Sequence, residues 1–321
     1  MNQAQLLSAA SGAALAAQQR YGIDRTKRVE VFDVLRHVAG EVFFRPLERI
    51  CGAYLPSKNA LAGVLINSNL PLSRQRYTAA HEFGHLFLNH NAWSVDEITG
   101  VSLEERRTWS DEENIAETFA AFFLMPPALV ESSLRELHIS RLTPETAYLL
   151  SLKMGTSYRA TVNQLQTLRK LSAAQAKKFR KIQPKQIKNE ISEHVAARHD
   201  VWVLDEHWNG QKVFPAVQDA IVLQLREIPT SGYIWTWHCN PHGLSTIADG
   251  FADDLTPAIG GERVRELVLE VASGDRPDQI DLELRQPWDP ESEPSAQFKV
   301  DVVPQELRKS GPLVLPRLQS N

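Results

Sequence analysis

The sequence predicts an α+β protein of two domains: a mainly helical first domain with a small sheet, then an all-β second domain. Three observations predict this class. The chain has 321 residues, for which two domains are the ordinary expectation. Helical patterns dominate residues 1–172. From about residue 195, apolar and polar residues alternate with the period of strands.

We predict four segments along the chain. Residues 1–172 form the first domain, 173–194 a basic linker and 195–305 a β-sandwich. Residues 306–321 form a weakly ordered tail, because this end of the chain contains prolines and charges without an apolar period.

The overall composition is that of a soluble globular protein, with 43% hydrophobic and 23% charged residues. A net charge of −4 provides no global basic field that would attract nucleic acid. The only two cysteines, Cys51 and Cys239, argue against a disulfide scaffold and fit a reducing cytosol. No stretch reaches the apolar length of a membrane-spanning helix. We therefore expect a cytoplasmic protein without a membrane partner.

The N-terminal run from Leu6 to Ala17 is rich in alanine and leucine. No lysine or arginine precedes it, so it lacks the charged start of a signal peptide. We interpret it as an amphipathic helix.

The pentad His81-Glu82-Phe83-Gly84-His85 carries the clearest chemical signal. Two histidines four apart on a helix share one face and can bind one metal ion. The glutamate between them can take a proton from a bound water, as in the H-E-x-x-H motif of zinc metallopeptidases. The alternative is a helix with two packing histidines. The run from Arg74 to His90 contains no proline, and Ser73 can cap it, so we predict a partly buried helix here.

A catalytic zinc site normally has three protein ligands and one open position. We interpret His90 as a residue of the helix end and look for the third ligand downstream. In the predicted helix over 111–127, Glu113 and Glu117 are four apart and face the same way. A solvated acidic face is the alternative, but apolar neighbours indicate burial, which a carboxylate tolerates beside a charge or a metal. We assign Glu113 to the metal and Glu117 to a hydrogen bond with a ligand histidine, with the reverse assignment left open.

These two helices resemble the ImmA/IrrE family of metallopeptidases. The resemblance rests on residues 76–85, on Glu113-x-x-Ala116-x-x-Phe119-Ala120-Ala121 and on Leu124-Met125-Pro126, with support from 52–56 and 63–67. It covers about residues 1–170 and implies a zincin-like fold. It also implies protein substrates such as helix-turn-helix repressors, cut under stress or in mobile-element control. Glu117 departs from the pattern, because the family more often has Asn or Asp at this position.

The expected chemistry is that of a gluzincin-like zinc endopeptidase. His81, His85 and Glu113 would hold Zn²⁺ and leave one position for a water, whose pKa zinc lowers to about 7. Glu82 would act as general base and then pass the proton to the leaving amine. Tyr77 lies one turn before the motif, where we expect a packing role. The thiolate of Cys51 could occupy the open position; the alternative is a buried structural cysteine.

The segment 177–188 contains six basic residues and no acidic one. Such a run can contact nucleic-acid phosphates, but it lacks interleaved aromatic residues for base stacking and also fits a solvated linker.

Strands are predicted in the second domain at 201–204, 220–225, 233–237, 267–271, 280–284 and 298–303. Turn residues separate them, as in an immunoglobulin-like β-sandwich. Three loops resemble those of the chagasin family, whose members plug the cleft of papain-type cysteine peptidases. The loop residues are Pro229, Thr230, Ser231, Gly232, Tyr233, Gly260, Gly261, Pro287 and Trp288. Gln286 stands where that family usually has Arg, and the loops could instead form only turns and core.

The leading hypothesis is an intracellular zinc endopeptidase that cleaves a specific regulator, a DNA-binding repressor, with the sandwich serving recognition or regulation. The alternative is a protease-inhibitor or binding protein that acts through the chagasin-like loops. A zinc-bound scaffold without catalysis is the third hypothesis.

Overall fold

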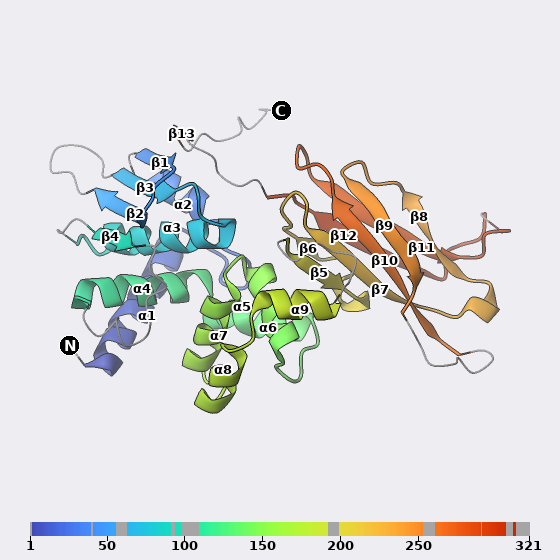
Figure 1. Ribbon diagram of the computed structural model, residues 1–321, viewed down its shortest axis with the longest axis horizontal. Helices are drawn as coiled ribbons and strands as arrows, with labels where there is room; N and C mark the ends of the chain where they lie inside the picture. The colour runs from blue at the N-terminus through green and yellow to red at the C-terminus, as the bar shows by residue number, and fades with distance from the viewer. Residues whose placement is uncertain are drawn as a thin grey trace. The chain divides into compact units, whose positions relative to one another are not determined.

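The computed structural model describes residues 2–39, 41–55, 63–90, 94–97, 109–191, 199–252, 261–289, 291–305 and 311–312 (Figure 1). These residues form two compact units. The first unit comprises Met1–Ser133, Met154–Ala176 and Leu307–Asn321, and the second comprises Leu134–Lys153 and Lys177–Glu306. The predicted class, a helical domain with a small sheet and an all-β sandwich, is confirmed.

The first unit begins with α1 (Gln3–Arg20) and α2 (Val31–Val38) and contains one sheet. The strands of this sheet are ordered β13-β1-β3-β2-β4. Only the β1–β3 pair is parallel. The strand bounds are β1 Glu41–Arg45, β2 Ile50–Leu55, β3 Gly63–Asn67, β4 Ser94–Glu97 and β13 Gly311–Pro312.

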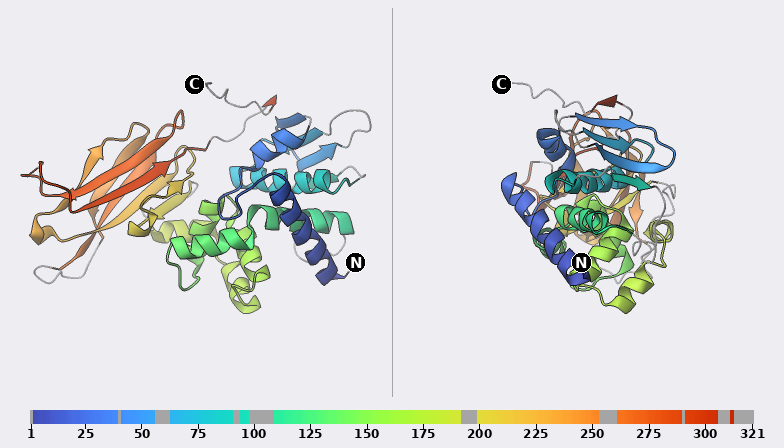
Figure 2. Two further views of the ribbon diagram at one scale, coloured as in Figure 1. Left: turned by 180° about the vertical axis from the view of Figure 1, so that it is seen from behind. Right: turned by 90° about the vertical axis from the view of Figure 1, so that its left-hand side faces the viewer.

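Below the sheet lie α3 (Leu72–Phe87) and then α4 (Asp111–Leu124), and α1 runs obliquely alongside these helices, as Figures 1 and 2 show. Aromatic rings hold α3 and α4 together: the Phe83 ring packs edge-on against Phe119 and Phe123, with centroid distances of 5.6 and 5.0 Å. The side chain of Gln18 donates to the Phe123 carbonyl at 3.0 Å and ties α1 to α4. Further helices of this unit are α7 (Tyr158–Thr167) and α5 (Pro127–Glu136), the last residues of which belong to the second unit.

Glycine at two positions permits close approach around α3. A Cβ on Gly84 would lie 3.0 Å from the Phe119 ring, so α4 reaches α3 only because this residue has no side chain. A Cβ on Gly52 of β2 would lie 2.4 Å from Thr78 Cγ2 and 2.8 Å from the Leu65 carbonyl oxygen. The sheet and both helices therefore meet at the metal-binding motif.

The predicted cap of α3 is wrong. The helix starts at Leu72 with Pro71 in the cap position, and no side chain caps it. The Pro71 carbonyl accepts the first helical hydrogen bonds, from the amides of Arg74 and Gln75, so Ser73 lies inside the first turn. The helix ends at Phe87, and His90 lies beyond it.

The prediction that no stretch reaches the apolar length of a membrane span also needs correction. Asp111–Glu136 meets that criterion by length and composition, and 56% of its apolar window is buried. The core of α4, from Ala116 to Leu124, packs inside the first unit, and the stretch divides into α4 and α5 at Pro126. By its packing, α4 is therefore a core helix of this unit.

The second unit is built around two four-stranded sheets, ordered β5-β7-β10-β9 and β6-β12-β11-β8. Val222, Val268, Leu282 and Phe298 are among the buried residues of its interior. The strand bounds are β5 Val201–Leu204, β6 Lys212–Val213, β7 Ala220–Glu227, β8 Ile234–Cys239, β9 Leu244–Phe251, β10 Arg263–Val271, β11 Asp278–Arg285 and β12 Ala296–Val302.

Two helices belong to the second unit, α6 (Pro144–Met154, whose last residue falls in the first unit) and α9 (Pro184–Ile191). Tyr148 of α6 donates its hydroxyl proton to Asp200 Oδ1 at 2.9 Å and accepts from the Val201 amide at 3.0 Å. Lys188 of α9 is 8% exposed, with its ammonium 3.5 Å from the same carboxylate. These contacts fasten both helices to the first strand of the sandwich.

The predicted basic linker over 173–194 contains α8 (Ala173–Phe179) and α9. A solvated linker is wrong for Lys188, since its charge is buried and paired. In the predicted tail, Gly311 and Pro312 pair with β1, and the other residues from 306 on lie outside the described part. The four predicted domain boundaries stay predictions.

Candidate functional site

The structure brings His81, His85 and Glu113 together, with potential ligand atoms within 4.8 Å of one another. The two Nε2 atoms are 3.1 Å apart, and Glu113 Oε2 lies 3.2 Å from His81 Nε2 and 3.5 Å from His85 Nε2. A tetrahedral zinc with bonds of about 2.1 Å separates its ligand atoms by about 3.4 Å. The three side chains therefore fit zinc in both chemistry and spacing, with one face of the triangle left for a fourth group.

Glu113 reaches the histidines from the first turn of α4. The Ser110 side chain caps this helix by accepting from the Glu113 amide at 3.2 Å. Burial alone would raise the pKa of Glu113, but hydrogen bonds and charges from His81 and His85 lower it well below the usual value. The carboxylate is therefore ionised and ready to bind a cation. A solvated acidic face is not what the structure shows, because Glu113 is 28% and Glu117 15% exposed.

Glu82 is fully buried between α3 and β2. Its Oε1 lies so close to Gly52 that a Cβ there would come within 3.2 Å. The backbone of β2 thus forms a wall beside the carboxylate. A buried carboxylate next to a metal site is well placed to hold and release a proton.

The outer nitrogens of the two histidines meet different partners. Glu117 Oε2 lies 3.6 Å from His81 Nδ1, an ion-pair distance slightly longer than a hydrogen bond. His90 Nδ1 lies 2.8 Å from His85 Nδ1. Burial, and then the neighbouring His85, lower the pKa of His90, which favours its neutral form. The sequence pattern did not predict that His90 contacts His85. Asn89 could have indicated it, because asparagine tolerates the left-handed conformation that turns the chain back towards His85.

Tyr77, Tyr54 and Cys51 also lie around this centre. Tyr77 donates its hydroxyl proton to the Glu117 carbonyl at 3.2 Å, which agrees with a packing role. The Tyr54 ring stacks on His85 at 6.4 Å, and burial raises the pKa of this tyrosine. Cys51 is fully buried, and Arg74 Nη2 lies 3.2 Å from its Sγ. Neither Cys51 nor Cys239 forms a disulfide among the described residues.

Two of the chagasin-like loops meet in the second unit. Gly232 has φ +77°, which favours glycine, and a Cβ there would lie 2.1 Å from the ring of Trp288. The Gln286 side chain donates to the Ser231 carbonyl at 3.4 Å. Trp288 is nevertheless 69% exposed. Thr230 and Pro287 are also exposed, while Gly261 and Tyr233 are half-buried and Gly260 lies outside the described residues.

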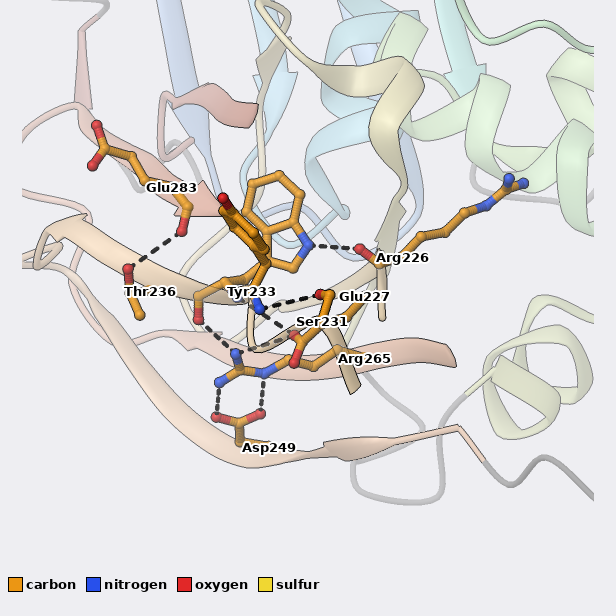
Figure 3. A network of polar contacts seen from close by, with 9 residues as sticks. Arg226, Glu227, Ser231, Tyr233, Thr236, Asp249, Arg265 and Glu283 are labelled. Atoms are coloured by element: carbon orange, nitrogen blue, oxygen red, sulfur yellow. Dashed lines mark hydrogen bonds and ion pairs between the residues drawn. The ribbon is translucent and has the colours of Figure 1, made fainter. Parts of the chain in front are cut away.

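A polar network braces the loop from Pro229 to Tyr233, as Figure 3 shows. Arg265 makes a two-pronged hydrogen bond to Asp249, at 2.8 and 2.7 Å, and pairs with the buried Glu227 at 3.6 Å. These contacts connect β9, β10 and the end of β7. Within the loop, Ser231 Oγ donates to the Ile228 carbonyl at 2.6 Å and accepts from the Tyr233 amide at 3.2 Å. The hydrogen bonds of Ser231 within the loop and the network of Arg265 beside it therefore both stabilise the conformation of the loop.

The basic segment presents exposed side chains at Lys177, Lys178, Lys181 and Lys185. Arg180 is half-buried and Lys188 pairs with Asp200. The contribution of this segment to nucleic-acid binding stays a prediction.

Comparison with known families assigns both units. Residues 39–160 match the family model described as the IrrE N-terminal-like domain, Peptidase_M78, and residues 215–302 match the chagasin family peptidase inhibitor I42. The class is thus a metallopeptidase-family domain joined to an immunoglobulin-like domain. The two matches fall on the regions where the sequence predicted these two families, and the predicted fusion is confirmed.

Three solved structures are similar to about a third of the chain, the first of them described as a cysteine protease inhibitor. EhICP2 from Entamoeba histolytica is 24% identical, covers 33% of this chain and 97% of its own, and has a TM-score of 0.30. Amebosin is 22% identical over 33% of this chain and 98% of its own, with a TM-score of 0.29. PbICP-C in complex with falcipain-2 is 15% identical over 35% and 94%, with a TM-score of 0.22. No curated protein matches the chain.

Proposed function

We propose that the chain is a zinc-dependent metalloendopeptidase that cleaves a specific protein regulator in the cytoplasm. The triangle of His81 Nε2, His85 Nε2 and Glu113 Oε2 carries this proposal, because its sides of 3.1–3.5 Å are those of three zinc ligands. The family match to Peptidase_M78 supports peptide hydrolysis as the chemistry. Two cysteines that form no disulfide in the described part of the chain suit a reducing compartment.

Zinc held by these three residues would polarise the scissile carbonyl and acidify the attacking water. Glu82 takes the proton from that water on its carboxylate and delivers it to the leaving amine. The carboxylate of Glu82 is fully buried, and Gly52 of β2 lies directly beside it. Glu117 and His90 contact the outer nitrogens of the two histidines.

The substrate that we propose is a DNA-binding repressor of the helix-turn-helix type, cut in a stress or mobile-element response. This proposal rests on the resemblance to the ImmA/IrrE family. In this role the chagasin-like unit recruits the substrate or restrains the active site.

The test replaces Glu82 by Gln, with Glu48→Gln as the matched control because Glu48 is exposed on the first unit. Glu82→Gln is expected to bind zinc as tightly as the wild type and to lose cleavage, whereas Glu48→Gln keeps both. The substrate comes from N-terminal proteomics of host cells with and without DNA damage, comparing wild type with Glu82→Gln. A single new N-terminus that depends on Glu82 would identify it. Wild-type cleavage by Glu82→Gln would refute the mechanism.

A second candidate function is binding and inhibition of a papain-type peptidase through the sandwich loops. The observation that favours it is the side chain of Trp288, which lies on Gly232 and is still 69% exposed. Aromatic side chains of this kind are common anchors of protein interfaces.

This candidate is tested with the full Glu82→Gln chain, titrated against papain with a fluorogenic substrate. Inhibition in the nanomolar range that Trp288→Ala abolishes would support it. Ile247→Ala is the control, since Ile247 is another exposed apolar residue of the same unit, on β9. No inhibition at micromolar concentration would remove this function.

A further inference from the structure

We propose that His90 is a positioning residue for the metal centre: its Nδ1 accepts the hydrogen bond that fixes the ring of His85 with Nε2 toward the metal. The inference rests on the proposed zinc site and adds a residue that lies outside the H-E-x-x-H motif. The observation behind it is the 2.8 Å separation between His90 Nδ1 and His85 Nδ1.

The backbone conformation at the end of α3 places His90 next to the His85 ring. Asn89 adopts a left-handed conformation with φ +53°, which asparagine tolerates better than most residues. The His90 amide then donates to the His85 carbonyl at 3.0 Å, and the Asn89 amide donates to the Leu86 carbonyl at 3.2 Å. These two bonds form the Schellman motif that closes many helices. The motif folds the chain back over the last turn, so that residue 90 returns to the side chain of residue 85.

The positions of the protons follow from metal binding. A neutral histidine that ligates through Nε2 carries its hydrogen on Nδ1. His85 Nδ1 is therefore the donor when the metal is present, and His90 Nδ1 must be the acceptor, with its own hydrogen on Nε2. The ring planes of the two histidines are at 73°, so the pair meets edge to face rather than stacked. A ligand histidine whose outer nitrogen has a fixed partner keeps both its tautomer and its orientation.

The two ligand histidines are supported unequally. His81 Nδ1 has Glu117 at 3.6 Å, whereas His85 Nδ1 has His90 at 2.8 Å. The face of the His85 ring is also covered by Tyr54, whose ring lies almost parallel at 13°. The hydrogen bond that His85 donates to His90 is thus the shorter of the two outer contacts, and it determines the direction of His85 Nε2.

The test measures zinc affinity by competition with a chelator. His90→Ala is expected to weaken zinc binding by tenfold or more, within the range of about 10- to 100-fold typical of such partners. His90→Gln, whose amide oxygen can accept the same hydrogen bond, is expected to recover most of the affinity. The control His37→Ala removes an exposed histidine of α2 whose ring nitrogen contacts the Asp33 carbonyl of the same helix, and should bind zinc like the wild type. Thermal unfolding of the metal-free proteins checks that the variants fold.

A measurement on the wild type requires no variant. Long-range ¹H–¹⁵N correlation spectra of the zinc-loaded protein should show His85 protonated on Nδ1 and His90 on Nε2 only. A His90 protonated on Nδ1, or a zinc affinity of His90→Ala within twofold of the wild type, would overturn the inference. If the wild type itself bound no zinc, the proposed function would fail instead, so the two failures are distinguishable.

Discussion

Replacement of Gly52 by Ala tests how closely the sheet must approach the catalytic helix. The added Cβ would lie 2.4 Å from Thr78 Cγ2, whereas carbon atoms in contact are about 3.5–4.0 Å apart. It would also lie 2.8 Å from the carbonyl oxygen of Leu65, a backbone atom of β3 that no rotamer change can move. Overpacking of a core costs about 1–3 kcal/mol, and a clash with backbone places this substitution at the upper end, about 3 kcal/mol.

The matched control is Gly12→Ala in α1, where an added Cβ meets no atom within 4 Å. That substitution should stabilise the helix by about 0.5–1 kcal/mol. The assay is hydrogen–deuterium exchange of peptides from α3 and β2 across a urea series, which reports on the first unit separately. Because Glu82 Oε1 would lie 3.2 Å from the new methyl group, kcat should also fall for Gly52→Ala and not for Gly12→Ala. A free energy of opening within about 0.5 kcal/mol of the wild type would refute the packing argument.

Two further predictions concern buried charge. Glu113→Gln should lose most of its zinc affinity in a chelator competition, while the neighbouring Glu112→Gln should keep it, since Glu112 is exposed on α4; equal affinities would remove Glu113 from the ligand set. Burial, and then Asp200, raise the pKa of Asp219 from 3.8 to about 7. Between these values the folded state binds more protons than the unfolded state, so the second unit should lose stability as pH rises from about 4 to about 7, by a few kcal/mol. Chemical denaturation of Asp219→Asn should lack this slope; an unchanged slope would contradict the assignment.

The sequence predicted elements where the hydrophobic pattern is strong, and the structure shows why others were missed. The predicted strand at 220–225 lies within β7, whose residues are nearly all buried. By contrast, β9 was not predicted, because its residues are mostly exposed and it lies at the edge of its sheet. Strands without a buried face carry little alternation to detect. β6, with two residues, and β4, with the sequence Ser-Val-Asp-Glu, are too short to show a period and were not predicted either.

The candidate site was predictable where it depends on spacing within one element and unpredictable where the chain reverses. His81 and His85 share a face of α3 by helical geometry alone, and so do Glu113 and Glu117 of α4. His90 was assigned to the same helix, where it would point away from His85. The left-handed conformation of Asn89 ends the helix and brings His90 next to His85. Helical spacing alone does not predict this reversal of the chain.

The metal centre is preorganised by the core of the first unit. Phe83 lies inside the H-E-x-x-H motif on the face opposite its chemistry, and its ring contacts Phe119 and Phe123 of α4. These residues are fully buried, so the contact between α3 and α4 is stabilised by apolar burial that no metal supplies. Because Gly84 allows α4 to approach, Glu113 arrives within 3.5 Å of both histidines while its charge is already offset by them. The proposed zinc site would therefore bind its metal with little rearrangement, and the contacts to the outer nitrogens of its histidines would add to its affinity.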